Sequence, residues 1–257
     1  MATQKIGHLT LVGAGPGAID LISVRGLRCI QQADTILYDA LVDPALLDYA
    51  PQAEKVFVGK RAGQHYKAQE EINALIQHYL LKGQHVVRLK GGDPLVFGRG
   101  HEEIEAVKTI GGTSSIVPGI SSVTGAPASI GIPITRRGVS DSFWVITGTT
   151  ASGALSTDLT LAAQSSATIL ILMGLQKLSL IVQLFKMYRK ENEPIAIIQN
   201  ASRDDQKQVI GTLQNIEQLV EEEKIGTPGI ILVGEVVKYS PLAIHEMINH
   251  EAVKDEG

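Results

Sequence analysis

The sequence predicts an α/β protein built from two α/β domains. Short aliphatic and β-branched runs alternate along the chain with amphipathic segments of helix length, which is typical of strands connected through helices. The runs form two sets of five, more than one compact sheet in a chain of 257 residues normally contains. Much of the glycine, 26 residues in total, falls directly after these runs. We therefore expect two roughly five-stranded sheets whose ligand loops meet in a cleft between the domains.

The first half of the chain contains five strand-like runs separated by helical segments. The run at residues 35–38 is short and apolar, whereas residues 68–81 repeat apolar positions at helical spacing. We expect strands at His8–Val12, Thr35–Tyr38, Lys55–Val58, His85–Leu89 and Ser114–Val117, and helices at Val24–Ala33, Pro44–Ala50, Ala68–Leu81 and Gly100–Thr109.

The second half contains the other five runs. A hairpin-like pair among them predicts a mixed sheet rather than a wholly parallel one. The stretch Pro118–Arg137 is punctuated by glycine and proline, so it is expected to hold the boundary between domains 1–119 and 120–257. We expect the strands at Phe143–Thr147, Thr168–Met173, Pro194–Gln199, Lys207–Gly211 and Gly229–Val233.

The composition predicts a soluble cytoplasmic protein. A single cysteine, Cys29, fits a reducing compartment, and the first residues lack the order of a signal peptide. The longest apolar stretch, Ile169–Leu175, is far too short to cross a membrane. A net charge of −4 and an aromatic content of 4% argue against a nucleic-acid surface. The histidines show no metal-ligand spacing, so no metal site is expected.

The first expected strand runs into a glycine-rich loop at residues 13–18, GAGPGA. Its glycines and final alanine fit the dinucleotide-binding fingerprint, and Asp39 follows the second strand, where an acidic residue binds ribose. However, Pro16 has no N–H to offer a pyrophosphate, and the next helical segment begins only near Val24. A nicotinamide dehydrogenase and a ligand-free turn both stay open as alternatives.

A second loop, residues 90–103, follows the fourth expected strand and reads KGGDPLVFGRGHEE. Its paired glycines allow a ligand close to the backbone, and Asp93 offers an acceptor for hydroxyls or an ammonium group. Arg99 and Glu102 share a face if a helix begins there. A surface ion pair would explain those two residues but not the preceding Gly-Gly-Asp-Pro.

Taken together, these segments resemble the tetrapyrrole methylases, most closely those that act on uroporphyrinogen III. The similarity runs from about Leu9 to Tyr239, and the run Val86–Glu103 is its most specific part. The motifs are Val12–Gly17 (VGAGPG), Tyr38-Asp39 with Leu41-Val42, Val58–Arg61 (VGKR), Val86–Glu103 (VVRLKGGDPLVFGRGHEE), Val117–Ile120 (VPGI), Gly131–Arg137 (GIPITRR), Thr147-Gly148, Met173–Leu175 and Gln199-Asn200.

The resemblance implies a homodimer that transfers two methyl groups from S-adenosylmethionine to uroporphyrinogen III, giving precorrin-2 for sirohaem and cobalamin and releasing S-adenosylhomocysteine. It assigns Asp39 as proton acceptor, Lys60 as proton donor, and Arg99 and Glu102 to the substrate. It places cofactor contacts at Pro16, Gly91, Gly92, Asp93, Val96, Ser121, Ser122, Met173 and Ala201.

The roles of the acidic residues stay open on physical grounds. Methylation of a pyrrole carbon gives a cation that must lose a proton, and Asp39, Glu102, water or a substrate carboxylate could accept it. Asp39 serves equally well as the cap of a turn. For Lys60 a structural role or a contact to a substrate carboxylate is favoured over proton donation.

A polycarboxylated acceptor needs cations, and arginine forks suit carboxylates. The chain also departs from the family at Ala18-Ile19, usually Asp-Pro, at His101 and Ala201, usually Gly, and at Arg136, usually His. A sister methylase of corrinoid synthesis, using the same cofactor on a later intermediate, stays an alternative. The basic residues in or beside the expected ligand loops are Lys60, Arg61, Lys90, Arg99, Arg136 and Arg137.

Overall fold

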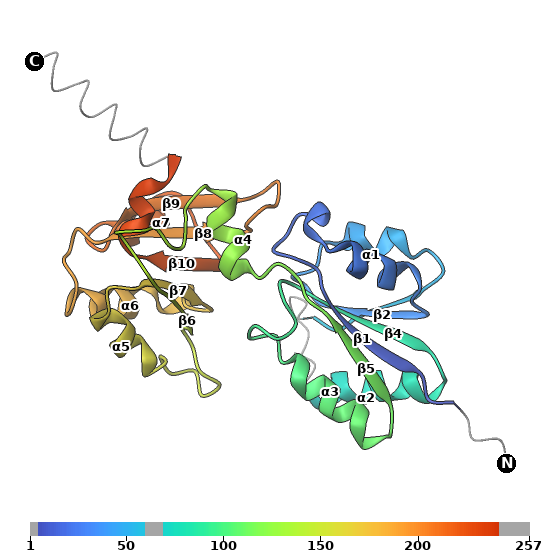
Figure 1. Ribbon diagram of the computed structural model, residues 1–257. Coiled ribbons are helices and arrows are strands. Elements are labelled where there is room, and N and C mark those ends of the chain that lie inside the picture. Colours follow the sequence, from blue (N-terminus) through green and yellow to red (C-terminus); the bar gives the residue numbers. More distant parts are fainter. Residues whose placement is uncertain (1–4, 60–68, 242–257) are drawn as a thin grey trace, which may run out of the picture. The chain divides into compact units, whose positions relative to one another are not determined.

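The computed structural model describes residues 5–59 and 69–241 (Figure 1). The chain divides into two compact units, Met1–Ser121 and Ser122–Gly257, whereas the sequence places the boundary after residue 119. Each unit contains one five-stranded sheet with helices, so the predicted α/β fold with two such sheets is confirmed. Within the described ranges, every helix is too short or too polar to cross a membrane.

The first unit is built on a wholly parallel sheet with the strand order β3-β2-β4-β1-β5. Helix α1 lies on one side of this sheet and helices α2 and α3 on the other (Figure 1). The elements are β1 (His8–Gly13), η1 (Ile19–Leu21), α1 (Val24–Gln31), β2 (Thr35–Tyr38), η2 (Pro44–Tyr49), β3 (Glu54–Phe57), α2 (Gln69–Leu81), β4 (His85–Lys90), α3 (Gly100–Thr109) and β5 (Thr113–Val117).

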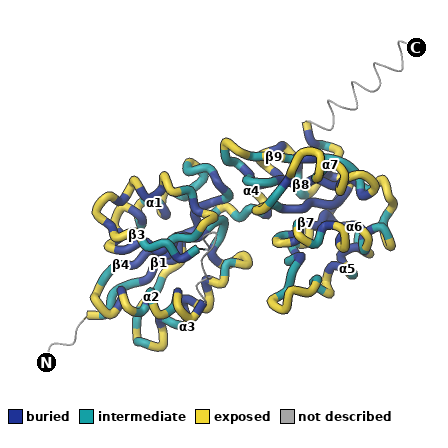
Figure 2. The backbone as a smooth tube through the Cα atoms, turned by 180° about the vertical axis from the view of Figure 1, so that it is seen from behind, coloured by how far each residue is buried: buried dark blue, intermediate teal, exposed yellow. Residues whose placement is uncertain are grey.

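Both faces of the first sheet are covered, which explains the nearly continuous apolar strands. Leu11 packs in one cluster with Ile76 of α2, whereas Ile36 and Leu89 pack on the opposite face with Ile30 of α1. Figure 2 shows the strands as mostly buried and the outer sides of the helices as exposed. From β1 the chain runs to β2 and on to β3 at one edge of the sheet. It then returns through β4, which lies between β2 and β1, to β5 at the other edge. The direction of winding therefore reverses between β1 and β4.

The second unit contains the mixed sheet that the sequence predicts, with the order β6-β7-β10-β8-β9. Strands β6 and β7 are parallel, β10 is antiparallel to both of its neighbours, and β8 and β9 form an antiparallel pair. The elements are α4 (Ser122–Ser129), β6 (Phe143–Thr147), α5 (Asp158–Gln164), β7 (Thr168–Leu172), η3 (Leu175–Lys177), α6 (Leu178–Lys186), β8 (Pro194–Gln199), β9 (Lys207–Thr212), α7 (Ile216–Glu222), β10 (Gly229–Val233) and η4 (Glu235–Tyr239).

One expected helix of the first unit differs in type. The segment predicted as a helix at residues 44–50 is the short 3₁₀ helix η2, which ends at Tyr49. Asp43 caps it by accepting a 2.9 Å hydrogen bond from the Ala45 N–H, and Pro44 fixes the backbone of its first residue. These signals start a helix, but the segment is too short to gain much from α-helical propagation.

Candidate functional site

The loops after β1, β4 and β5 meet where the winding of the first sheet reverses. Gly15 and Gly92 form an isolated antiparallel bridge, in which the Gly92 N–H donates to the Gly15 carbonyl over 2.7 Å. The Gly119 N–H donates to Asp93 Oδ2 over 3.1 Å. Ligands of open α/β sheets collect at such a reversal, outside the carboxyl ends of the strands. Three loops distant in sequence thus form one backbone surface at this position.

Glycine is required here by contact between backbones. A Cβ atom on Gly13 would lie 2.5 Å from the Cα atom of Gly119, and one on Gly119 would collide with the Gly92 carbonyl oxygen. Gly15 and Gly92 also have positive φ angles of 86° and 65°, which side chains disfavour. The glycine motifs therefore reflect close packing of the three loops.

The first loop leads into the short 3₁₀ helix η1 and does not open an α-helix as a dinucleotide-binding loop does. Helix α1 begins only at Val24, where the Ser23 hydroxyl caps it by accepting a 3.0 Å hydrogen bond from the Gly26 N–H. Pro16 lies between the loop glycines and contributes no N–H. This geometry disfavours the nicotinamide alternative.

Asp93 organises the second loop. Its Oδ1 accepts from the Leu95 N–H over 2.8 Å, and its Oδ2 accepts from Gly119. Each carboxylate oxygen has a further lone pair, so a role toward a ligand stays a prediction. The loop exposes Val96, and Phe97 and Arg99 hold left-handed backbone conformations with φ of 53° and 56°. Such conformations in residues other than glycine are a frequent mark of functional loops.

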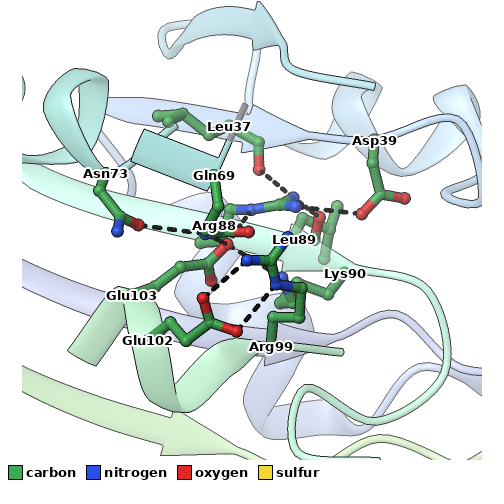
Figure 3. Close-up of polar contacts among 10 residues, drawn as sticks. All are labelled: Leu37, Asp39, Gln69, Asn73, Arg88, Leu89, Lys90, Arg99, Glu102 and Glu103. Carbon is green, nitrogen blue, oxygen red and sulfur yellow. Dashed lines mark hydrogen bonds and ion pairs between the residues drawn. The ribbon is translucent and has the colours of Figure 1, made fainter. Parts of the chain in front are cut away.

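Four charged side chains form a cluster inside the first unit, beside the second loop (Figure 3). We call Asp39, Arg88, Lys90 and Glu103 the Arg88 cluster. Glu103 Oε1 accepts from Arg88 Nε and from Lys90 Nζ, both over 3.0 Å. Arg88 Nη2 donates to Asp39 Oδ2 over 3.2 Å. Arg88, Lys90 and Glu103 are buried, whereas 21% of the Asp39 side chain is exposed.

Lys90 differs from its predicted role as a cation for substrate carboxylates. Only 5% of the residue is exposed, and its ammonium group contacts Glu103 instead of solvent. Burial lowers the pKa of the Lys90 ammonium group, and the nearby Arg88 charge lowers this pKa further. Residues two positions apart in a strand point to the same face of the sheet. Lys90 therefore points to the same buried face of β4 as Arg88.

Asp39 has the turn-capping contact that its position suggested. Its Oδ1 accepts from the Leu41 N–H over 3.0 Å, while Oδ2 contacts Arg88. The catalytic role implied by the resemblance stays a prediction beside this structural one. Lys60 and Arg61 lie outside the described residues.

Arg99 and Glu102 lie together at the start of α3, as their spacing suggests. Arg99 Nε and Nη2 donate to the two Glu102 oxygens over 2.8 and 2.7 Å. The hydrogen bond from Arg99 lowers the pKa of the Glu102 carboxyl group. Nearly half of each side chain is exposed, so the pair contributes little to stability. Its charges are accessible to a ligand.

In the second unit, the predicted cofactor residues Met173 and Ala201 follow β7 and β8. These strands both run antiparallel to β10, so their carboxyl ends lie at the same edge of the sheet. Met173 is exposed and has a φ of 54°, and its carbonyl accepts from Thr149 Oγ1 over 2.9 Å. Ala201 is buried beside this edge.

The other predicted site residues, Ser121, Ser122, Arg136 and Arg137, differ in their surroundings. Ser121 ends the first unit and Ser122 begins α4 of the second. Arg136 is exposed, and its guanidinium group lies 3.7 Å from the ring centroid of Tyr239, a cation–π contact. Arg137 is exposed beside it.

The family of the chain is decided by comparison with known proteins. The family model described as Tetrapyrrole (Corrin/Porphyrin) Methylases matches residues 8–217. The chain belongs to this family. The family membership that the sequence motifs predict is therefore confirmed.

Two curated relatives show how much of a tetrapyrrole methylase the chain represents. It is 43% identical over 234 residues to uroporphyrinogen-III C-methyltransferase of Methanocaldococcus jannaschii, covering 90% of this chain and 97% of that protein. It is 42% identical over 240 residues to siroheme synthase of Baumannia cicadellinicola, covering 92% of this chain and 52% of that protein. The chain thus spans about half the length of the siroheme synthases that it matches.

Solved structures of tetrapyrrole methylases share the fold. Uroporphyrin-III C-methyltransferase from Thermus thermophilus, complexed with S-adenyl homocysteine, matches with a TM-score of 0.78 and 35% identity, covering 90% of this chain and 99% of that one. A cobalt precorrin-4 methyltransferase matches with a TM-score of 0.81 and 28% identity, covering 90% and 95%. Fold similarity therefore does not separate these two substrate classes.

The residues that the sequence reasoning missed are Arg88 and Glu103. Both lie within the specific run Val86–Glu103, but neither was assigned a role. The sequence does contain a pattern that indicates them: Arg88 and Lys90 stand two positions apart in the largely apolar strand β4. Two cations on one face of a buried strand require buried anions, because unpaired charges inside a protein are very costly.

No group of three or more His, Cys, Asp or Glu side chains suited to hold a metal ion occurs among residues 5–59 and 69–241. The acidic residues of the Arg88 cluster are instead occupied by cationic side chains.

We predict that Arg99→Ala raises the pKa of the Glu102 carboxyl group toward its ordinary value, because it removes the hydrogen bond and charge that lower it. An NMR titration of glutamate side-chain carboxyl groups checks this. Lys238→Ala, which removes a similarly exposed ion pair with Glu235, serves as the control and is expected to leave Glu102 unchanged. An unaltered Glu102 titration in Arg99→Ala would show that the ion pair does not persist in solution.

Proposed function

We propose that the chain is an S-adenosylmethionine-dependent methyltransferase that adds two methyl groups to uroporphyrinogen III, giving precorrin-2. The family-specific run Val86–Glu103, which contributes the loop at the reversal of the first sheet, is the observation that carries this proposal. The similarity to a uroporphyrinogen-III C-methyltransferase over nearly its full length supports the same acceptor.

S-adenosylmethionine would supply a methyl group activated by its sulfonium charge, with the thioether S-adenosylhomocysteine as the leaving group. The task of this chain is to bind and orient the two reactants in line, which contributes roughly 7–11 kcal/mol in favourable cases. Close glycine packing fixes the loops after β1, β4 and β5 relative to one another. Asp93 in the second of these loops retains acceptor lone pairs for the hydroxyl or ammonium groups of a ligand. The proposed contacts are Pro16, Gly91, Gly92, Asp93, Val96, Ser121, Ser122, Met173 and Ala201.

We propose Asp39 as the group that accepts the proton released after methylation. Its carboxylate is fixed through both oxygens and is still partly exposed, which suits a positioned base. Glu102 is the alternative in the described chain, and it is likewise held by an arginine, but its side chain is 47% exposed and has no second contact that fixes it among the hydrogen bonds described. Lys60 keeps its proposed role as proton donor or carboxylate contact.

The proposed substrate contacts are Arg99, Glu102, Arg136 and Arg137. The three arginines are exposed, so their guanidinium groups lie at the surface, where carboxylates of the tetrapyrrole can reach them. Arg99 is held by Glu102 and Arg136 by the ring of Tyr239, which reduces the entropy lost when a ligand binds them.

The test is incubation of the pure protein with S-adenosylmethionine and uroporphyrinogen III. We expect a product heavier by two methyl groups in mass spectrometry. Methylation of a later corrinoid intermediate in place of uroporphyrinogen III would assign the chain to the sister methylases. No methyl transfer to any tetrapyrrole would refute the proposal.

We predict that Arg99→Ala weakens tetrapyrrole binding roughly 10- to 100-fold, the effect of losing one charge-assisted hydrogen bond. Affinity for S-adenosylmethionine should stay unchanged, since Arg99 is proposed to contact only the acceptor. Calorimetric titration of each ligand measures both values, with Lys238→Ala as the exposed-cation control. Equal tetrapyrrole affinity in the two variants would remove Arg99 from the binding site.

We also propose that the protein acts as a homodimer in the cytoplasm, without binding nucleic acid or membranes. The family resemblance supports the dimer, and the single cysteine and net charge of −4 are consistent with this setting. Light scattering coupled to size-exclusion chromatography should give twice the chain mass of 27.5 kDa, and a monomer mass would exclude the dimer.

A further inference from the structure

Arg88 connects the two carboxylates of the Arg88 cluster through a single guanidinium group (Figure 3). Nε donates to Glu103 over 3.0 Å, and Nη2 donates to Asp39 over 3.2 Å. Nη1 donates to the carbonyls of Leu89 over 2.8 Å and Leu37 over 3.4 Å. All three nitrogens of the side chain are therefore engaged, and they join β2, β4 and α3 at one point.

Stability alone does not explain this arrangement. Burying charged groups removes them from water, and replacing a buried ion pair by apolar residues is often neutral or stabilising. The cluster contains two cations and two carboxylates within an otherwise aliphatic layer formed by residues such as Leu11, Leu37 and Ile104. Costly polar clusters next to ligand loops favour a functional role.

Glu103 anchors the far end of the cluster. Its Oε1 accepts from Arg88, from Lys90 and, over 3.5 Å, from Gln69 Nε2. Its Oε2 is buried and has no hydrogen-bond partner among the described residues. The carboxylate thus directs one oxygen at Arg88 and Lys90 and holds the Arg88 fork in a single orientation.

Asp39 lies at the opposite end, where the cluster reaches solvent. The Leu41 N–H holds one of its oxygens and Arg88 holds the other. Two-point fixation of this kind fixes the plane of the carboxylate and so the direction of its free lone pairs. The effectiveness of a base depends on such positioning relative to the proton that it accepts.

We infer that Arg88 and Glu103 are positioning residues, which act on methyl transfer by orienting the Asp39 carboxylate; this inference rests on the proposed function and on Asp39 as its base. Arg88 cannot be replaced by lysine in this role. A lysine ammonium is a compact charge without the planar fork, so it cannot span Asp39, Glu103 and the two carbonyls together.

The test is a double-mutant cycle of Arg88→Lys with Asp39→Asn, measured as kcat for methylation of uroporphyrinogen III per S-adenosylmethionine-binding site. Asp39→Asn should lower kcat roughly 10²- to 10⁴-fold, the usual contribution of a general base. Arg88→Lys should lower kcat up to roughly 10²-fold through misplacement of Asp39, with KM for S-adenosylmethionine nearly unchanged. The double variant should equal Asp39→Asn within about twofold, because Arg88 has nothing left to orient.

Arg189→Lys provides a matched control in the second unit. The side chain of Arg189 is also largely buried, with 6% of it exposed, and it pairs with Glu193 over 2.8 Å and donates to the Ser165 and Ala167 carbonyls. Its replacement should lower the melting temperature and leave kcat per binding site unchanged, alone and in the Asp39→Asn background. This separates loss of stability from loss of orientation.

Each remaining outcome overturns the inference. Multiplicative losses in the double variant would show that Arg88 acts independently of Asp39, and full activity of Asp39→Asn would remove the base that it orients. If Arg88→Lys does not fold, Glu103→Gln replaces it in the cycle, and failure of both to fold assigns the cluster to stability only. If the wild-type protein does not methylate uroporphyrinogen III, the proposed function fails first and this inference falls with it.

Discussion

Close contact between backbones at the reversal of the first sheet is the constraint on which the rest of the site depends. The bridge between Gly15 and Gly92 joins the loops after β1 and β4, and the Asp93 carboxylate ties the loop after β5 to them. Because Gly119 contacts the Gly92 carbonyl directly, even a methyl group would separate these loops. The glycine packing thus fixes the start of the segment that carries the exposed residues Val96, Arg99 and Glu102.

The charges of the site follow from the same geometry. The loop after β4 lies at the reversal only because β4 is a central strand, and a central strand buries both of its faces. Arg88 and Lys90 therefore enter the interior and must find anions there. Glu103 of α3 supplies one and Asp39 at the end of β2 supplies the other. Of the two carboxylates in this cluster, Glu103 is buried and Asp39, which follows the end of β2, is partly exposed.

The strands and the glycine loops could be predicted because their signals are local. The motif at residues 90–103 and the late start of α1 at Val24 follow from neighbouring residues in the chain. The Arg88 cluster could not be predicted in this way, since the contact between Arg88 and Asp39 joins residues 49 positions apart. The sequence predicts Lys90 as a ligand contact because its position beside a loop is visible locally. That its side chain is buried against Glu103 depends on the order of the strands, which is not visible locally. The substrate roles of exposed residues such as Arg137 depend on which ligand binds. Neither the apolar pattern of the sequence nor the packing of the chain determines that ligand.

In the second unit, some positions after the strands hold side chains in left-handed backbone conformations. Met173, Asn200 and Ser202 have φ angles of 54°, 49° and 63°, a conformation that costs about 1–3 kcal/mol outside glycine. Glycine would relieve this strain, so the side chains there are retained at a cost, which favours their use toward a ligand. Ala201 lies between two of these residues without a positive φ of its own. The alanine that stands where the family usually has glycine therefore introduces no backbone strain, and the proposed cofactor contact at this position is compatible with it.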